Sequence, residues 1–354
     1  GAGATGYTFS YSLALMGAGH LVGISVGISM LLGIAIAWAG AVPILTAMTP
    51  QGGAALGDFV TEVWRTKVRF IGAGAMAVAA IWSLARTIGP ILAGLAEVAR
   101  AQREKPALID HTDRDLSLRT MIGLVVLCTL VLAALVWRFV DVPALGGSAV
   151  ALTIISIPIV LLGGFLIAAI CGYMAGLIGS SNSPVSGVGI LAAVGCSLCF
   201  IAIVAPNATN SSALVATALF VTSILFAGAV CSNDNLQDLK TGQLVGASPR
   251  RQQIALLIGV TAASLVVPLV LNLLSQAYGF AGAPNLDTVT AQPLPAPQAN
   301  LISALAQGVI GHSLEWNMIG IGAAIGIAII VLDAAMRAKG WVAVPPLAAG
   351  FGIY

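Results

Sequence analysis

Charged residues are scarce in this sequence of 354 residues. Asp, Glu, Lys and Arg make up 8% of the chain, against roughly 25% in a typical soluble protein. Residues 1–57 contain none of these four residue types, and neither do the 92 residues between Asp141 and Asp234. A soluble domain carries charge over its surface, so this scarcity excludes one. The net charge of +2 is also too small to indicate a nucleic-acid partner.

Short segments that alternate apolar and polar residues, the sign of a membrane β-barrel, are also lacking. Hydrophobic residues make up 58% of the chain and fall in continuous runs, and about 20 apolar residues cross a bilayer as a helix. A helix satisfies its own backbone hydrogen bonds in hydrocarbon. The sequence therefore predicts an all-α fold: a polytopic transmembrane helix bundle with broken or re-entrant helices. We expect a single transmembrane domain over residues 1–354, with about eight to ten membrane segments.

Three further absences narrow the function. There is no GxxxxGK[ST] motif, so ATP drive within this chain is not expected. There is no initiator Met and no signal-peptide pattern, and the chain ends inside an apolar segment, so we expect it to be part of a longer protein. Of the five cysteines, Cys196 and Cys199 form a CxxC, but no second Cys pair or His lies near it in sequence. We therefore predict no metal site and no cofactor, and interpret the cysteines as small buried residues.

Glycine, proline and charge divide the apolar runs. We expect a short helix that ends near Gly17, and a connection over 58–69. The expected helices are 21–45, 70–99 (interrupted at Arg86 and at Gly89–Pro90), 120–137, 149–178 (tilted or broken), 186–205, 212–232, 252–275, 301–310 (capped by Asn300), 316–332 and a last one from 341.

Lys and Arg in short loops indicate which side is cytoplasmic. The expected loops 100–119, 233–251 and 333–340 carry most of these residues, and simple alternation of spans puts all three on the cytoplasmic side. The Pro-rich loop 279–299 has no Lys or Arg and falls on the external side. The connection 58–69, with three basic residues, disagrees with this alternation.

The segment Gly172–Gly187, GYMAGLIGSSNSPVSG, interrupts helices that are long enough to span the membrane. Broken backbone at membrane depth persists only where it is packed in protein or lines a water-filled cavity. Transporters use such interruptions to hold polar substrates and ions, and an ordinary surface loop between two spans is the alternative. The candidate substrate or pathway residues are Gly176, Gly179, Ser180, Ser181, Asn182, Ser183, Pro184, Ser186 and Gly187.

This segment resembles the signature G-L-I-G-S-S-x-N-P-V-S-G of the oligopeptide transporter (OPT) family. The stretch 231–249, with its DLKTG and GASP elements, and the opening stretch 11–23, YSLALMGAGHLVG, are similar to the same family. The three matches lie in order across most of the chain, which differs from the signature in reading Asn182-Ser183-Pro184. The resemblance implies a bacterial-type transporter in the bacterial inner (cell) membrane, in a complete protein with more spans. It implies proton-coupled uptake of small peptides or, alternatively, of metal held by a peptide-like chelator.

Four ionisable residues are candidates within this interpretation. His20 follows two glycines at an expected helix break, and a histidine titrates in the range that suits proton coupling. His312 and Glu315, three residues apart, would share a helix face and form a second proton-coupling pair, or lie in water at the interface. Arg86 lies within a span, where it would meet a structural partner, a cavity or an anionic group of the substrate.

Two other classes of protein remain as alternatives. Asp234 and Asp238 suggest a membrane prenyl transferase, which binds Mg²⁺ and pyrophosphate through two Asp-rich motifs, but the sequence has no convincing second motif. We therefore expect that the protein is not an enzyme. A passive channel is the other alternative, and accumulation of substrate against a gradient distinguishes it from a transporter.

Overall fold

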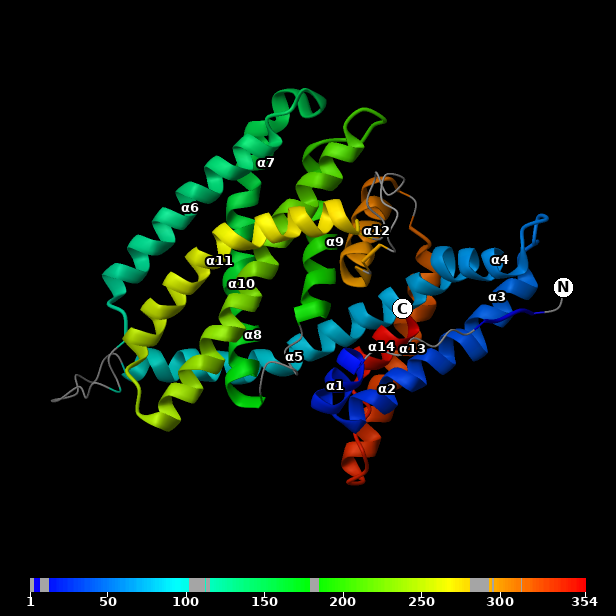
Figure 1. The fold of residues 1–354 in the computed structure, drawn as a ribbon, viewed down its shortest axis with the longest axis horizontal. Helices are drawn as coiled ribbons and strands as arrows, with labels where there is room; N and C mark the ends of the chain where they lie inside the picture. Colours follow the sequence, from blue (N-terminus) through cyan, green and yellow to red (C-terminus); the bar gives the residue numbers. More distant parts are fainter. Residues whose placement is uncertain are drawn as a thin grey trace. The chain divides into compact units, whose positions relative to one another are not determined.

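The computed structural model describes residues 3–6, 13–101, 112, 115–178, 185–280, 293–294, 296–312 and 314–354 (Figure 1). Within these ranges the chain forms helices joined by turns and short connections, with no β-strand and one isolated β-bridge, between Phe280 and Leu294. The all-α prediction is therefore confirmed.

The helices follow one another along the whole chain. They are α1 (Leu13–Val22), α2 (Ile24–Ile34), α3 (Val42–Met48), α4 (Leu56–Val63), α5 (Arg69–Ala101), α6 (Leu118–Val140), α7 (Ala149–Pro158), α8 (Gly164–Ile178), α9 (Val185–Ile203), α10 (Ser211–Val245), α11 (Pro249–Ala277), α12 (Pro297–Ile310), α13 (Trp316–Ala338) and α14 (Pro346–Ile353). π-helical turns join several of them without a break: η1 (Ala35–Ala41), η2 (Trp64–Val68) and η5 (Ile159–Gly163), and the 3-10 turn η4 (Pro143–Ser148) precedes α7.

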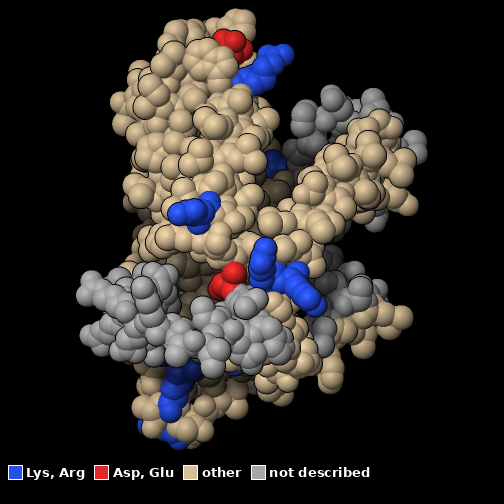
Figure 2. Space-filling view, turned by 90° about the vertical axis from the view of Figure 1, so that its left-hand side faces the viewer, with Lys and Arg blue, Asp and Glu red and all other residues tan. Residues whose placement is uncertain are grey.

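Seven helical stretches in the described residues are long and apolar enough to cross a membrane. They are Ile24–Met48, Leu56–Arg86, Leu118–Val140, Pro143–Gly176, Ser211–Val245, Pro249–Ala277 and Trp316–Ala338. Many of their large apolar side chains are exposed, and no residue of α11 is buried. Figure 2 accordingly shows a largely uncharged surface with a few separate groups of charged side chains. Such surface is stable against lipid, so these helices form an integral, multi-pass membrane protein.

The first predicted break is real but lies later in the sequence. The short helix was expected to end near Gly17, whereas α1 continues to Val22 and the break falls at Gly23, whose φ is 89°. A left-handed backbone of this kind favours glycine, whereas Gly17 and Gly19 fit within the helix. The following span runs from Ile24 to Met48, close to the expected 21–45.

Two predicted interruptions are absent or reduced. The expected break at Arg86 and Gly89–Pro90 was wrong, because α5 continues to Ala101; proline removes only one hydrogen bond from a helix that keeps its others. The long segment expected at 149–178 contains Pro158 and then the π-helical turn η5, and the chain remains helical through it.

Three predicted loops are partly or wholly helical, which corrects their boundaries. The loop expected at 233–251 is a short turn, because α10 continues to Val245; Gly246, with φ 71°, and the hydrogen bond from the Ala247 amide to the Gly242 carbonyl end it. The connection expected at 58–69 lies within α4, η2 and the start of α5. The loop expected at 333–340 begins only after Ala338.

The two remaining loops lie mostly outside the described residues. Where the expected 279–299 loop ends, α12 starts at Pro297, because proline suits the first turn of a helix. Asn300 therefore lies inside α12, and its predicted role as the cap was wrong. Most of the expected 100–119 loop is not described, and α6 begins at Leu118.

The chain divides into two compact units, residues 1–86 with 314–354 (unit 1) and residues 87–313 (unit 2). Glycines bring the helices of unit 1 close together. A Cβ atom added at Gly322 or Gly326 of α13 would press on the backbone of Ile71 or Ala75 in α5, and one at Gly352 of α14 would press on Met30 of α2. Gly322 contacts Ile71, and Gly326, four residues later, contacts Ala75, also four residues later. The two helices α5 and α13 therefore run in the same direction within this unit.

In unit 2, α10 is the central helix. It packs against α8, α9 and α12 and contacts α6 and α11 (Figure 1). Its buried face carries small and branched side chains, and Phe220 stacks on Phe139 of α6 with ring centroids 4.4 Å apart. Consequently α10 positions both helices that flank the predicted interruption.

Candidate functional site

The predicted interruption falls between α8 and α9. Helix α8 ends at Ile178 and α9 begins at Val185. Six of the candidates between them lie outside the described residues: Gly179, Ser180, Ser181, Asn182, Ser183 and Pro184. The side chain of Ser186 is not described either, whereas Gly176 and Gly187 are placed near the facing ends of α8 and α9. The structure thus fixes the two helices on either side of the motif.

On the α8 side, small residues allow a close approach to α10. The Ser232 hydroxyl of α10 donates a hydrogen bond to the Ala168 carbonyl oxygen of α8, at 2.7 Å. A Cβ atom added at Gly172 would overlap that hydroxyl, and one at Gly176 would reach ordinary contact distance from Leu236. An interhelical hydrogen bond between small residues is a frequent means of joining helices in lipid.

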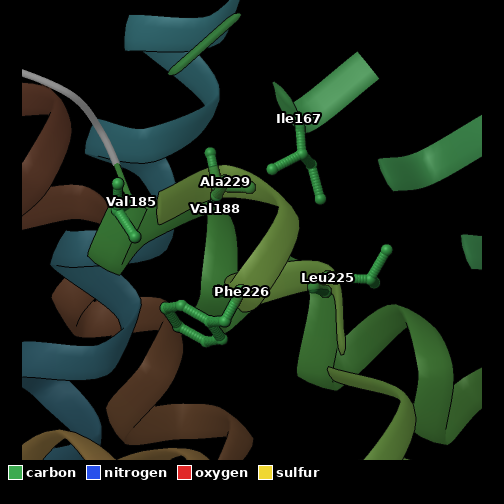
Figure 3. Close-up of a pocket in the computed structure, with 8 residues that line it drawn as sticks. Ile167, Val185, Val188, Leu225, Phe226 and Ala229 are labelled. Atoms are coloured by element: carbon green, nitrogen blue, oxygen red, sulfur yellow. The ribbon is translucent and has the colours of Figure 1, made fainter. Parts of the chain in front are cut away.

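On the α9 side, the contact with α10 is apolar and dry. Ile167, Val185, Val188, Leu225, Phe226 and Ala229 surround a small hollow between α8, α9 and α10 (Figure 3). The hollow has no room for a water molecule, and a Cβ atom added at Gly189 would overlap the Phe226 ring. Next to the motif, this interface therefore serves packing and holds no polar ligand.

A larger groove of about 400 Å³ lies beside this contact, along α7, η5, α9 and α10. Its lining is apolar apart from two thiols: Ile155, Pro158, Ile159, Leu162, Gly163, Ile167, Ala192, Gly195, Cys196, Cys199 and Leu225. It offers no charge to a peptide. Of the cysteines, Cys171 and Cys196 are buried as predicted, whereas Cys128, Cys199 and Cys231 are exposed, so for these three the prediction was wrong.

The structure does not bring the four ionisable candidates together on one helix. His20 is exposed on α1 and Arg86 is exposed on α5. His312 has φ 51° and lies outside any helix, and α13 begins only after Glu315. The expectation that His312 and Glu315 share a helix face was wrong, because the chain leaves helical geometry between α12 and α13. Both side chains are exposed.

Sequence reasoning missed a cationic and aromatic cluster in unit 1, here called the Arg69 cluster: Arg69, Trp64, Trp38 and Tyr354. The Arg69 guanidinium carbon lies 4.3 Å from the centre of the Tyr354 ring and 5.3 Å from that of Trp64. Trp38 in turn stacks on Trp64 with ring centroids 5.8 Å apart. Each cation–π contact contributes roughly 0.5–2 kcal/mol, depending on how dry it is. Only the five-residue spacing of Trp64 and Arg69 was visible in the sequence.

The cations around Arg69 are already occupied or exposed. Arg65 pairs with Glu62 at 3.3 Å, and both side chains are more than half exposed. The Lys67 ammonium donates a hydrogen bond to the Thr49 hydroxyl at 2.9 Å. Within the described part of the chain, Arg69 forms no ion pair, and its buried Nε–H has no hydrogen-bond acceptor.

The buried carboxylate of unit 1 is structural. Asp333 on α13 accepts hydrogen bonds from the Arg337 Nε, at 2.8 Å, and from the Val344 amide, at 2.9 Å. These bonds hold the turn between α13 and α14. Among the described residues no group of three or more His, Cys, Asp and Glu side chains could hold a metal ion.

Comparison with known proteins identifies the family. The chain is 39% identical to a Haemophilus influenzae protein named "Putative oligopeptide transporter", over 97% of this chain and 56% of that protein, so it spans about half of the relative's length. No solved structure matches the chain. The family model of OPT oligopeptide transporter proteins matches residues 1–354, the full chain. The chain therefore belongs to the OPT oligopeptide transporter family.

Proposed function

We propose that the protein is a secondary active transporter that moves small peptides across the bacterial inner membrane, coupled to protons. The observation that carries this proposal is the family match over all 354 residues. The named relative, an oligopeptide transporter by its printed description, supports peptides as the substrate. The apolar helices supply the membrane setting that such transport requires.

The interruption between α8 and α9 is the proposed substrate pathway. Its serines and Asn182 offer the polar groups that a peptide backbone needs, and lipid could not solvate them. The packing of α10 against α8 and α9 supports this assignment, because it holds both ends of the interruption. Groups supported by packed helices position a ligand more accurately than a loop alone.

His20 is the first proposed site of proton coupling. It lies in the helix that ends just before Gly23, and an imidazole exchanges protons near neutral pH. Glu315 and His312 are further proposed proton-coupling sites, and each is proposed singly and not as a pair on one helix face. Arg86 is proposed to contact an anionic part of the substrate.

Two alternatives compete with this proposal. Transport of a metal–chelate complex would use the same fold with a different cargo. The prenyl transferase alternative is weaker, because Asp234 and Asp238 are exposed on one helix and the family is one of transporters.

Uptake by the full-length protein in proteoliposomes tests the function. Labelled tripeptides and an iron–chelator complex are compared under an imposed inward proton gradient, with and without a protonophore. We expect tripeptide accumulation that the protonophore abolishes. Accumulation of the iron–chelator complex alone would show that the substrate is a metal–chelate complex and not a peptide. Equilibration of either compound without accumulation would indicate a channel.

A further inference from the structure

The Arg69 cluster forms in a helix that changes geometry at this point. Trp64 opens the π-helical turn η2, Arg69 follows that turn directly, and Trp38 lies in the second π-helical turn, η1. π-helical turns inside α-helices occur frequently at functional sites, because the extra residue redirects side chains. Here one turn places Trp64 beside the Arg69 guanidinium, and the other places Trp38 against the Trp64 ring.

The charge of Arg69 is incompletely compensated in the described structure. The guanidinium is half-buried, its Nε–H is buried without an acceptor, and the charged group that acts on it is Arg65, which has the same sign. Glu62 and Lys67 lie in the same helical stretch, and both have other partners. Aromatic faces stabilise the cation but leave the edge of the guanidinium without an acceptor. An oxyanion that lies in the plane of the guanidinium would supply the missing acceptor.

The geometry suits a carboxylate in particular. The guanidinium carbon lies 4.3 Å from the centre of the Tyr354 ring, and this contact with the ring face uses none of the N–H donors, which all lie in the guanidinium plane. A planar carboxylate accepts two parallel N–H bonds from one edge of this plane, which an ammonium group cannot provide. Each peptide substrate carries one such group, at its C-terminus.

We infer that Arg69, in contact with the rings of Trp64 and Tyr354, binds the C-terminal carboxylate of the transported peptide. This inference rests on the proposed function for its substrate class and adds a binding residue in unit 1 to the proposed pathway residues of unit 2. It predicts that transport favours peptides with a free C-terminus. The phosphate of an anionic lipid has related chemistry, and the experiment separates it from the peptide.

The test compares trialanine with its C-terminal amide as competitors of labelled-peptide uptake by the full-length protein. In the wild type we expect the free acid to bind about 10- to 100-fold more tightly, the usual effect of a charged hydrogen bond. Arg69→Gln should weaken the free acid to the level of the amide and leave the amide unchanged. Arg69→Lys keeps the charge without the fork and should recover only part of the preference. The control Arg65→Gln, in the same helix, should keep the full preference.

Three outcomes would overturn the inference. The wild type could treat acid and amide alike, Arg69→Gln could weaken both equally, as a structural or lipid-binding role predicts, or Arg65→Gln could lose the preference just as much. A second readout is the thermal stabilisation of the purified protein by acetyl-trialanine and by its amide, in the wild type and Arg69→Lys. Absence of uptake in the wild type would defeat the proposed function, and this binding preference would still decide whether Arg69 recognises a carboxylate.

Discussion

At the scale of single residues, two ionisable side chains differ in their contacts. Asp333 is buried, and both of its oxygens accept hydrogen bonds from its own unit. His20 is exposed, and its helix ends two residues later at Val22. A buried carboxylate whose oxygens are hydrogen-bonded stabilises the fold, whereas the exposed imidazole is accessible to solvent and remains a candidate for the proposed proton coupling.

Asp333→Ala should destabilise the protein by about 1–3 kcal/mol, because the buried Val344 amide then lacks an acceptor. Asp333→Asn keeps an acceptor at that position and should cost less. The measurement is the thermal unfolding midpoint of the purified full-length protein in detergent. An unchanged midpoint in the alanine variant would show that the turn before α14 does not depend on this bond.

His20→Gln should reduce uptake driven by a proton gradient at least tenfold, since glutamine cannot carry a proton. Exchange of labelled for unlabelled peptide across the membrane, without a gradient, should remain near the wild-type rate. The control is the amount of protein inserted in the vesicles. Normal gradient-driven uptake in the variant would assign His20 to packing or to the surface.

At the scale of helices, α10 decides how α8 and α9 lie beside the interruption. Gly172 and Gly189 allow contact with Ser232 and Phe226 of α10, so these glycines are required for close approach. Gly228, which lies on α10 itself, has open space where a Cβ atom would lie. The difference separates glycines that set the geometry from one that does not.

Gly187→Leu and Gly179→Leu should each abolish transport while much of the protein still inserts. Leucine at either position would add a bulky side chain to the proposed pathway, and Gly187 is buried at the start of α9. The readouts are uptake and the elution profile in detergent. Gly228→Leu is the matched control and should retain most activity. Wild-type transport in both Leu variants would remove the interruption from the pathway.

At the scale of the whole molecule, the distribution of charge predicts its orientation. The segments 100–119, 233–251 and 333–340 are rich in Lys and Arg, and such segments stay in the cytoplasm. The helical extension of α10 changes the shape of 233–251 but leaves its Lys and Arg in place.

Cysteines introduced at Lys240 and Arg103, in a variant without its own cysteines, should resist an impermeant thiol reagent added to intact cells. Both positions should react after the cells are opened. A cysteine at Gln292, within the Pro-rich 279–299 segment, is the external control and should react in intact cells. Strong labelling at Lys240 and Arg103 from outside would reverse the predicted orientation.

The sequence by itself determined that this protein is a bundle of membrane helices. Hydrocarbon leaves a chain with such long uncharged runs few ways to satisfy its backbone, and a helix does so locally. It also indicated the family and the place of the interruption after Ile178, because these depend on neighbouring residues. Local signals were less reliable for boundaries: Pro90 and the charges of 233–245 both suggested breaks that an already formed helix accommodates.

Only the tertiary structure decided which distant residues meet. Arg69 and Tyr354 lie far apart in sequence, and the packing of α14 against α2 and α5 brings the ring over the cation. Likewise, the sequence pattern of α10 did not reveal that its helix faces both α8 and α9. Such contacts depend on how whole helices pack, through glycine contacts and shape, and no local pattern in the chain encodes them.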